Sequence, residues 1–296
     1  MSGSPQEPLY VGIDAGSSAT KCVVLNASGA LVGHHVVLSG FDFPGAADNV
    51  LGQPLLQAQG SRDDIAFCVA TGYGRESVAL ADRCVTEITC HARGAREWYP
   101  QVRHIIDIGG QDAKVISLND QGNMADYRMN TKCAAGTGTF LESIAVKLGV
   151  PLSKIDELAI KSSGGTVVNS YCTVFAATEV LERIKAGEPR EDISMGLYRS
   201  IASRVLEMMS VRDGVVAVTG GVVAYGRAMV RALNERLDAE VLLPPLPQHA
   251  GAYGAALIAM ARSQARDGET DSATARAKWD RVDHCKHGAA AKGGDR

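Results

Sequence analysis

Two stretches of this 296-residue sequence repeat each other at a fixed offset of 93 positions. YVGIDAGSSATKCVVLNASGAL, which starts at Tyr10, aligns with RHIIDIGGQDAKVISLNDQGNM, which starts at Arg103. The matched pairs are Asp14 with Asp107, Gly16 with Gly109, Lys21 with Lys114, Leu25 with Leu118, Asn26 with Asn119 and Gly29 with Gly122. So many matches in about twenty residues indicate an internal duplication. The chain is therefore restricted to folds in which one structural unit occurs twice.

Each copy of the repeat has the pattern of a β-hairpin. An apolar strand ends in Asp-x-Gly, a short turn follows, and a second strand of alternating apolar residues ends in a Gly-containing turn. Glycine at such a tip lets backbone N–H groups approach an anion. In the first copy the hydroxyls of Ser17, Ser18 and Thr20 add donors for phosphate oxygens, and in the second copy Gly109 and Gly110 form the tip. Both tips are candidate phosphate-binding turns.

Carboxylates stand beside these turns, at Asp14, Asp107 and Asp112. They would repel a bare phosphate, so they favour Mg²⁺ that bridges carboxylate and polyphosphate, usually through water. Only the second copy contains Gln111 and Asp112, at the positions where the first copy has Ser18 and Ala19. The candidate nucleotide-binding residues of the two hairpins are Asp14, Gly16, Ser17, Ser18, Thr20, Lys21, Asp107, Gly109 and Gly110.

A third glycine turn follows an apolar strand in GVVAVTGGVVAYG, residues 214–226. A strand that ends in Thr219-Gly220-Gly221 leaves a surface free of side chains, on which an adenine or a ribose can lie. A helix over about residues 226–237 is expected to follow. Gly220 and Gly221 are therefore further candidate nucleotide-binding residues.

The duplicated hairpin and the late Gly-Gly turn together resemble the actin, Hsp70 and sugar-kinase superfamily, over about residues 10–262. The resemblance implies an α/β fold in which two ribonuclease H-like sub-domains close on ATP and Mg²⁺, with the repeated hairpins facing each other across the cleft. In that arrangement we expect Gln111 and Asp112 to orient the attacking water, so that one hairpin binds ATP and the other also hydrolyses it. We expect residues 1–101 to form the first sub-domain, completed by a C-terminal helix at about 249–262. Residues 102–248 are expected to form the second.

The last segment, residues 263–296, is polar and rich in Ala and Gly, without a persistent apolar period. Such a composition predicts a mobile tail. His284, Cys285 and His287 lie close together within it, but in a tail of this composition they do not indicate a metal site.

The sequence contains seven cysteines and no CxxC pair, which argues against a zinc ribbon or a local redox dithiol. Cys22 and Cys68 stand in apolar strand-like runs and are expected to be small core residues. Cys133 differs, because KCAAGTG, residues 132–138, surrounds it with the smallest side chains. These leave room beside the thiol for a group bulkier than a side chain.

Cys133 and Cys172 both precede predicted helices. The first helix has a Thr-x-x-Glu capping box at Thr139 and Glu142 and ends at Gly149. Its predicted apolar face consists of Phe140, Leu141, Ile144, Ala145 and Leu148. The predicted apolar face of the second helix consists of Val174, Ala177, Leu181 and Ile184. At the start of a helix the N–H groups and the positive dipole end favour a thiolate or an anionic cluster, although an ordinary cysteine also occurs there.

Two thiolates are too few for a four-iron cluster, which needs four cysteine ligands. They suffice if a second subunit supplies two more across a two-fold axis, because such an axis brings equivalent residues together. Cys133 and Cys172 of each subunit are therefore candidate ligands of a [4Fe-4S] cluster that two subunits share at their interface.

Five motifs in order are similar to one family, the BadF/BadG/BcrA/BcrD ATPases of 2-hydroxyacyl-CoA dehydratases and benzoyl-CoA reductases. The motifs are CHARGA, DIGGQDAK, KCAAGTGTFLESIA, CTVFAATEVL and VTGGV. The resemblance implies a homodimer, or a heterodimer with a paralogous subunit, that carries one [4Fe-4S] cluster on two cysteines per subunit. It also implies that ATP hydrolysis drives a low-potential electron into a partner iron-sulfur enzyme. The matching cysteines here are Cys133 and Cys172.

The chain departs from the family pattern at two positions. Family members often have Asp where Thr131 stands and Arg where Thr139 stands, so contacts to the partner are expected to differ. Some reductase subunits lack the GGQD turn, whereas this chain keeps it at Gly109 to Asp112. We therefore expect the chain itself to hydrolyse ATP.

The formal net charge of −3 gives no basic field for nucleic acid or for anionic lipid. The N-terminal MSGSPQEPLY has no apolar targeting segment, so a cytoplasmic location is the default expectation. Two alternatives remain open at this point: a small-molecule kinase of the same superfamily without a cluster, and an actin-like assembly protein without iron. CHARGA, residues 90–95, receives no chemical role from the sequence.

Overall fold

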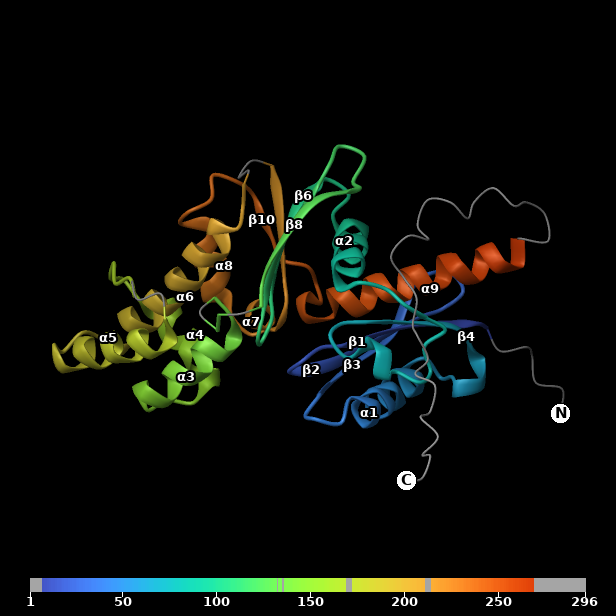
Figure 1. The fold of residues 1–296 in the computed structure, drawn as a ribbon, viewed down its shortest axis with the longest axis horizontal. Coiled ribbons are helices and arrows are strands. Elements are labelled where there is room, and N and C mark those ends of the chain that lie inside the picture. The colour runs from blue at the N-terminus through green and yellow to red at the C-terminus, as the bar shows by residue number, and fades with distance from the viewer. Residues whose placement is uncertain (1–6, 132, 135, 169–171, 211–213, 269–296) are drawn as a thin grey trace, which may run out of the picture. The chain divides into compact units, whose positions relative to one another are not determined.

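The computed structural model describes residues 7–131, 133–134, 136–168, 172–210 and 214–268. Within that part, the residues up to 90 together with those from 251 onward form one compact unit, called unit 1 here, and residues 91–250 form unit 2. Figure 1 shows the elements of both units. The last helix continues to Gly268, beyond the start of the expected tail. Residues 269–296, with the histidines and the cysteine noted there, lie outside the described residues.

Unit 1 begins with a strand hairpin and ends with a long helix. Its elements are β1 (Leu9–Ala15), β2 (Ala19–Leu25), β3 (Leu31–Leu38), α1 (Phe43–Gln57), η1 (Arg62–Asp64), β4 (Ile65–Thr71), η2 (Arg75–Ser77), β5 (Arg83–Cys84) and α9 (Ala250–Gly268). Helix α2 (Glu87–Trp98) contains the boundary between the two units.

Unit 2 repeats the hairpin and adds helices. Its elements are β6 (Val102–Ile108), β7 (Ala113–Leu118), β8 (Met124–Asn130), α3 (Gly138–Leu148), α4 (Leu152–Lys161), α5 (Thr173–Lys185), α6 (Arg190–Glu207), β9 (Val215–Thr219), α7 (Gly221–Ala224), α8 (Arg227–Asn234), β10 (Val241–Leu242) and η3 (Pro247–His249). The helix expected over about 226–237 is α8, and a short additional helix, α7, precedes it and starts directly at the Gly-Gly turn.

The two sheets have the same topology, which confirms the duplication. Their strand orders are β3-β2-β1-β4-β5 and β8-β7-β6-β9-β10. In each sheet the first strand pairs antiparallel with the second and parallel with the fourth, as β1 does with β2 and β4, and as β6 does with β7 and β9. Both hairpins of the sequence repeat therefore occupy the centre of a sheet.

Helices cover both faces of the unit 1 sheet (Figure 1). A Cβ on Gly12 of β1 would lie 2.0 Å from the carbonyl oxygen of Ala252, so only glycine lets α9 approach this strand. On the other face, a Cβ on Gly33 of β3 would lie 2.3 Å from the carbonyl oxygen of Pro54 in α1. Close backbone contacts on both faces thus fix the strands that carry the first turn.

Unit 2 differs from unit 1 by an insertion. Residues 39–42 connect β3 to α1 in unit 1, whereas α3, α4 and α5 stand between β8 and α6 in unit 2. The five apolar residues predicted for α3 are all buried, and Gly149 ends that helix in the left-handed conformation at φ 65°. The insertion contains both candidate cluster cysteines. Across the described residues, the structure shows no helix with the length and apolar character needed to cross a membrane.

Candidate functional site

The turn of unit 1, between β1 and β2, is tight and is held by hydrogen bonds from side chains of neighbouring residues. Gly16 lies where a Cβ would be 2.8 Å from the carbonyl oxygen of Ala19. Lys21 Nζ donates to Asp14 Oδ2 at 3.1 Å. Ser39 Oγ donates to the Gly16 carbonyl at 2.6 Å and lies 2.8 Å from Thr20 Oγ1. Thr20 is fully buried, so we propose that its hydroxyl braces the turn instead of binding phosphate.

Ser17 and Ser18 lie at the outer end of the same turn. Ser17 is half-buried and Ser18 is exposed, so both remain accessible to a phosphate group. We therefore propose, as the sequence predicts, that both hydroxyls donate to phosphate oxygens.

The turn of unit 2 has the same lysine–aspartate pair at its base and different side chains at its tip. Lys114 Nζ lies 3.3 Å from Asp107 Oδ2, as Lys21 does from its partner in unit 1, and also 2.8 Å from Asp112 Oδ2. A Cβ on Gly109 would lie 2.7 Å from Asp112 Oδ1. Gln111 is exposed and Asp112 is half-buried. The two residues proposed to orient water are thus adjacent, and Asp112 is held by a buried lysine.

A threonine is the last residue of the fourth strand in each sheet, and the sequence analysis did not recognise these two threonines as equivalent. Thr71 lies opposite Asp14 across β4 and β1, and Thr219 lies opposite Asp107 across β9 and β6. Thr219 Oγ1 donates to Asp107 Oδ1 at 3.0 Å. The signal was present in the sequence, since VATG at residues 69–72 and AVTG at 217–220 each follow an apolar run.

A glycine in the left-handed region follows each of these threonines. Gly72 has φ 88° and Gly220 has φ 102°. A Cβ would lie 2.5 Å from Asp14 Oδ1 at the first position and 2.3 Å from the Ile108 carbonyl oxygen at the second. Gly220 is thus required by close packing on β6, whereas Gly221, the candidate partner for adenine or ribose, starts α7 in more open surroundings.

The two candidate cluster thiols are exposed, in contrast to three other cysteines of the described residues. Cys22, Cys68 and Cys90 are buried, and burial raises the pKa of the thiols of Cys22 and Cys68, which keeps them protonated. Cys133 and Cys172 are both exposed. The prediction that the first two are core residues is confirmed.

Cys172 lies at the start of α5, whereas Cys133 lies in the loop that leads to α3, and the two helices pack together. Cys172 is the N-cap residue of α5. Asn130, the last residue of β8, holds the backbone of Cys133 through its amide group: Oδ1 accepts from Cys133 N at 3.2 Å, and Nδ2 donates to Cys133 O at 2.9 Å. The loop of Cys133 is therefore attached to the sheet that carries the second turn.

The capping box predicted at Thr139 and Glu142 is wrong. Helix α3 starts at Gly138 with Thr137 as its N-cap. The Thr139 hydroxyl instead donates to the Gly110 carbonyl at 2.7 Å, and its backbone N–H donates to the same oxygen at 2.8 Å. The first turn of α3 is thus hydrogen-bonded to the second hairpin tip, and this tertiary contact takes the hydroxyl that a capping box would need.

The apolar face predicted for α5 is wrong at three of its four positions. Of the predicted residues only Ala177 packs against the core, beside the buried Ala176 and Val180, whereas Val174, Leu181 and Ile184 are exposed. Val174 is 71% exposed and Phe175 is 68% exposed, and Leu181 is exposed as well. Exposed large apolar side chains on one helix commonly mark a contact surface for another protein.

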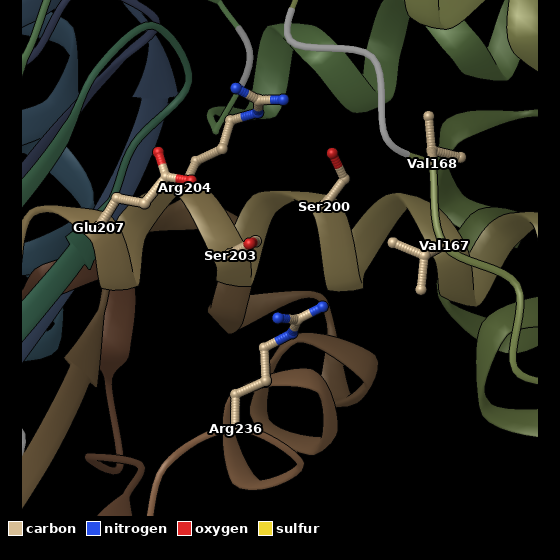
Figure 2. Close-up of a pocket in the computed structure, with 7 residues that line it drawn as sticks. All are labelled: Val167, Val168, Ser200, Ser203, Arg204, Glu207 and Arg236. Carbon is tan, nitrogen blue, oxygen red and sulfur yellow. The ribbon is translucent and has the colours of Figure 1, made fainter.

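A pocket of about 290 Å³ lies on α6 in unit 2. Its lining residues are Val167, Val168, Ser200, Ser203, Arg204, Glu207 and Arg236 (Figure 2). The serines and Arg204 come from α6, and Arg236 comes from the segment after α8. A Cβ on Gly136 would lie 3.5 Å from the Cβ of Arg204, so this arginine packs beneath the loop of Cys133. No sequence motif indicated this pocket.

Comparison with known proteins identifies the family. The model of the BadF/BadG/BcrA/BcrD ATPase family matches residues 11–259. The chain belongs to this family. An (R)-2-hydroxyglutaryl-CoA dehydratase activating ATPase from Acidaminococcus fermentans is 43% identical over 253 residues, which are 84% of this chain and 96% of that protein. One of the benzoyl-CoA reductase subunits from Thauera aromatica is 32% identical over 261 residues, which are 84% of this chain and 92% of that protein.

Solved structures agree with the family and confirm the fold. The activator of the 2-hydroxyisocaproyl-CoA dehydratase from Clostridium difficile, with bound ADPNP, matches at 36% identity and a TM-score of 0.83, over 90% of this chain and all of that one. A ROK family glucokinase from Streptomyces griseus matches at 14% identity and a TM-score of 0.50, over 85% of this chain and 99% of that one. The second match shows the shared fold alone. The expected actin-like and sugar-kinase-like fold is confirmed.

Proposed function

We propose that this protein is an ATP-hydrolysing iron-sulfur electron donor. It passes a low-potential electron to a partner enzyme of the 2-hydroxyacyl-CoA dehydratase or benzoyl-CoA reductase type. The dehydratase type is favoured, because the activating ATPase from Acidaminococcus is 43% identical to this chain and the reductase protein from Thauera is 32% identical. The observation that carries the proposal is the pair of exposed thiols, one in the loop before α3 and one at the N-cap of α5, two helices that pack together.

The donor set fits a cluster that two subunits share. Within the ranges that the structure describes, His, Cys, Asp and Glu side chains form no group of three or more that could hold a metal ion. Two thiolates per chain, at Cys133 and Cys172, would complete a four-cysteine set with a second copy across a two-fold axis. The exposed apolar side chains of α5, the helix that Cys172 caps, supply a surface for that copy. When bound, a [4Fe-4S] cluster supplies a one-electron carrier.

The two hairpin turns would bind ATP and Mg²⁺. Asp14 and Asp107 stand at the bases of the turns, each held by a lysine, and would act on Mg²⁺ through its water shell. The buried hydroxyl of Thr71, beside Asp14, has no hydrogen-bond partner in the described part of the chain. An orphaned hydroxyl next to a carboxylate fits a site where a metal-bound water supplies the missing partner.

The residues of the second turn would perform the hydrolytic step. Gln111 would orient the attacking water, and Asp112 would accept a hydrogen bond from it. Gly110 passes any change in this turn to α3, because its carbonyl accepts two hydrogen bonds from Thr139. The loop of Cys133 directly precedes that helix, so hydrolysis and the thiol environment would be coupled within unit 2.

Anaerobic purification tests the proposal. The wild-type protein is expected to be brown, to contain about four irons per dimer and to hydrolyse ATP. Cys133→Ala and Cys172→Ala should each lose the iron and electron delivery while ATP still binds. Cys22→Ala is the matched control, because it removes a buried thiol. Full iron content in either of the first two variants, or a colourless protein that phosphorylates an alcohol, would overturn the proposal, and the latter would support a kinase.

A further inference from the structure

Helix α2 brings a histidine of the CHARGA stretch against the sheet of unit 2. His91 is 5% exposed, and its Nδ1 lies 3.2 Å from Thr219 Oγ1 and 3.6 Å from Asp107 Oδ1. Thr219 is fully buried. These three side chains come from α2, β9 and β6, and they meet on one face of the sheet, below the second turn.

The chemistry of the hydroxyl sets the direction of the hydrogen bonds. A threonine hydroxyl has one proton to donate, and Thr219 donates it to Asp107 Oδ1 at 3.0 Å. The threonine oxygen then accepts from His91, which places a proton on Nδ1 of the imidazole. The result is a directed chain from His91 through Thr219 to the carboxylate.

The second oxygen of Asp107 extends this chain to the tip of the turn. Lys114, which is 2% exposed, lies 3.3 Å from Asp107 Oδ2 and 2.8 Å from Asp112 Oδ2. Asp112 is next to Gln111 in sequence. The orientation of the Asp107 carboxylate therefore determines where Lys114 holds the carboxylate of the hydrolytic turn.

The turn of unit 1 has the same lysine, aspartate and threonine at its base, but the threonine hydroxyl has no histidine beside it among the described residues. Lys21 lies 3.1 Å from Asp14 Oδ2, and Thr71 lies opposite Asp14 across the sheet. The Thr71 hydroxyl, however, is buried with no hydrogen-bond partner among the residues that the structure describes. The histidine thus accompanies the turn that contains Gln111, and the other turn lacks it.

We propose that His91 is a positioning residue for ATP hydrolysis: through Thr219 it fixes the Asp107 carboxylate, and through Lys114 it fixes Asp112 beside Gln111. This inference rests on the proposed function, because it requires ATP to be hydrolysed at the second turn. A small displacement of groups that orient a reacting water affects the transition state more than it affects binding. Loss of His91 should therefore lower kcat and leave the affinity for nucleotide nearly unchanged.

The chain provides a matched control in the same sheet. His104 is buried to the same extent, at 6% exposure, and its Nδ1 lies 3.0 Å from Ser117 Oγ. It stands on β6 three residues before Asp107. His104→Ala removes a buried imidazole and its hydrogen bond to a hydroxyl, as His91→Ala does, but away from the turn. Melting temperatures of both variants would show whether the structural cost is comparable.

The experiment measures ATP hydrolysis and nucleotide binding by the full-length protein with Mg²⁺. His91→Ala is expected to lower kcat at least about tenfold and to change the KM for ATP and the Kd for ADP about twofold or less. His91→Asn, whose amide N–H can take the place of Nδ1–H, should recover much of the rate. Nitrogen-15 NMR of the wild-type imidazole should show a protonated Nδ1, and Thr219→Val should shift that signal.

Three results would overturn the inference. The first is a kcat for His91→Ala within about twofold of wild type, because displaced water-orienting groups should slow the reaction more than that. The second is a fall in kcat for His104→Ala equal to that for His91→Ala. The third is an imidazole that carries its proton on Nε2 alone. If the wild-type protein itself does not hydrolyse ATP, the proposed function fails and this inference fails with it. If the wild-type protein hydrolyses ATP and His91→Ala hydrolyses it at the same rate, the inference about His91 fails and the proposed function stands.

Discussion

The two hairpin turns have the same framework and different connections to the rest of the protein. In both, a lysine in the second strand pairs with an aspartate in the first. At the other end of each hairpin the side chain of Asn26 or Asn119 accepts two backbone N–H groups, and Gly29 or Gly122 takes a positive φ. The repeated residues therefore build the scaffold, since they make the same contacts in both units.

The residues that differ decide what each turn is attached to. In unit 1 the Gly16 carbonyl accepts from Ser39, in the segment that leads into α1. In unit 2 the Gly110 carbonyl accepts from Thr139, in the helix that follows the loop of Cys133. A bracing hydroxyl of the same kind thus leads to a plain helix in one unit and to the thiol-bearing insertion in the other. The two units thus both have a hydroxyl that donates to a carbonyl of the turn, and they differ in the segment from which that hydroxyl comes.

The largest expected effect comes from the tip residue that the turns do not share. Gln111→Ala should lower kcat for ATP hydrolysis about a hundredfold, because a group that orients the reacting water acts in the transition state. The affinity for ATP should hardly change. Ser18→Ala, at the aligned position of unit 1, should change the nucleotide affinity and leave kcat nearly intact. Steady-state rates and equilibrium binding would check both, and equal effects on kcat would remove the functional distinction between the turns.

A smaller effect is expected when the hydroxyl that braces each turn is removed. Thr139→Val removes the hydroxyl donor to Gly110, worth about 1 kcal/mol, and should reduce the difference in cluster potential between the ADP and ATP states by about 40 mV. Ser39→Ala, the control, should leave that difference unchanged. Redox titration of the anaerobic protein with each nucleotide measures it. An undiminished difference in Thr139→Val would show that the turn and the thiols are not coupled through α3.

Acid pH should reduce the stability that two carboxylates of unit 2, Asp192 and Glu235, give to the folded protein. Hydrogen bonds from Ser162 and Gly164 lower the pKa of Asp192, and the Arg199 guanidinium lowers the pKa of Glu235. Because both pKa values are lower in the folded state than in the unfolded state, this stabilisation is complete above the ordinary carboxyl pKa of about 4.5. It is lost as the pH falls through the lowered values.

The measurement is chemical unfolding at several pH values between neutral and acid. The variant Asp192→Asn with Glu235→Gln should lose less stability than wild type as the pH falls below about 4.5. Asp48→Asn, which breaks an exposed pair with Arg62 in unit 1, is the control and should follow wild type. Identical pH profiles for all three proteins would contradict the assignment of this acid sensitivity to unit 2.

The smallest difference is expected at the duplicated asparagine turns. Asn26→Ala and Asn119→Ala each remove two backbone hydrogen bonds in equivalent places, and Asn26→Ala also removes an exposed one from the Ser28 hydroxyl. Each should lower the free energy of unfolding by about 1 kcal/mol, and neither should change ATP hydrolysis. Urea unfolding would compare them. A much larger loss at one position would show that the two scaffolds have diverged further than their contacts indicate.

The sequence predicted the parts of this protein that depend on local pattern. The hairpins, the helix α3 with its buried face and the buried Cys22 and Cys68 follow from the alternation and period of apolar residues. What the sequence missed depends on distant partners: His91 and Thr219 are separated by 128 positions. Helical period identified the apolar stripe of α5, yet it could not show that Val174 faces outward, because an interface and a core have the same periodicity.

Asn130 joins two kinds of chemistry at one strand end. It pairs with Ala113 across β8 and β7, and Ala113 directly follows Asp112. Its amide also grips the peptide of Cys133 on both sides. A single asparagine thus links the turn proposed to hydrolyse ATP to the loop of the thiol proposed to bind the cluster. Its loss would release the Cys133 peptide from the strand that pairs beside Asp112, so nucleotide turnover and electron delivery would lose their common support.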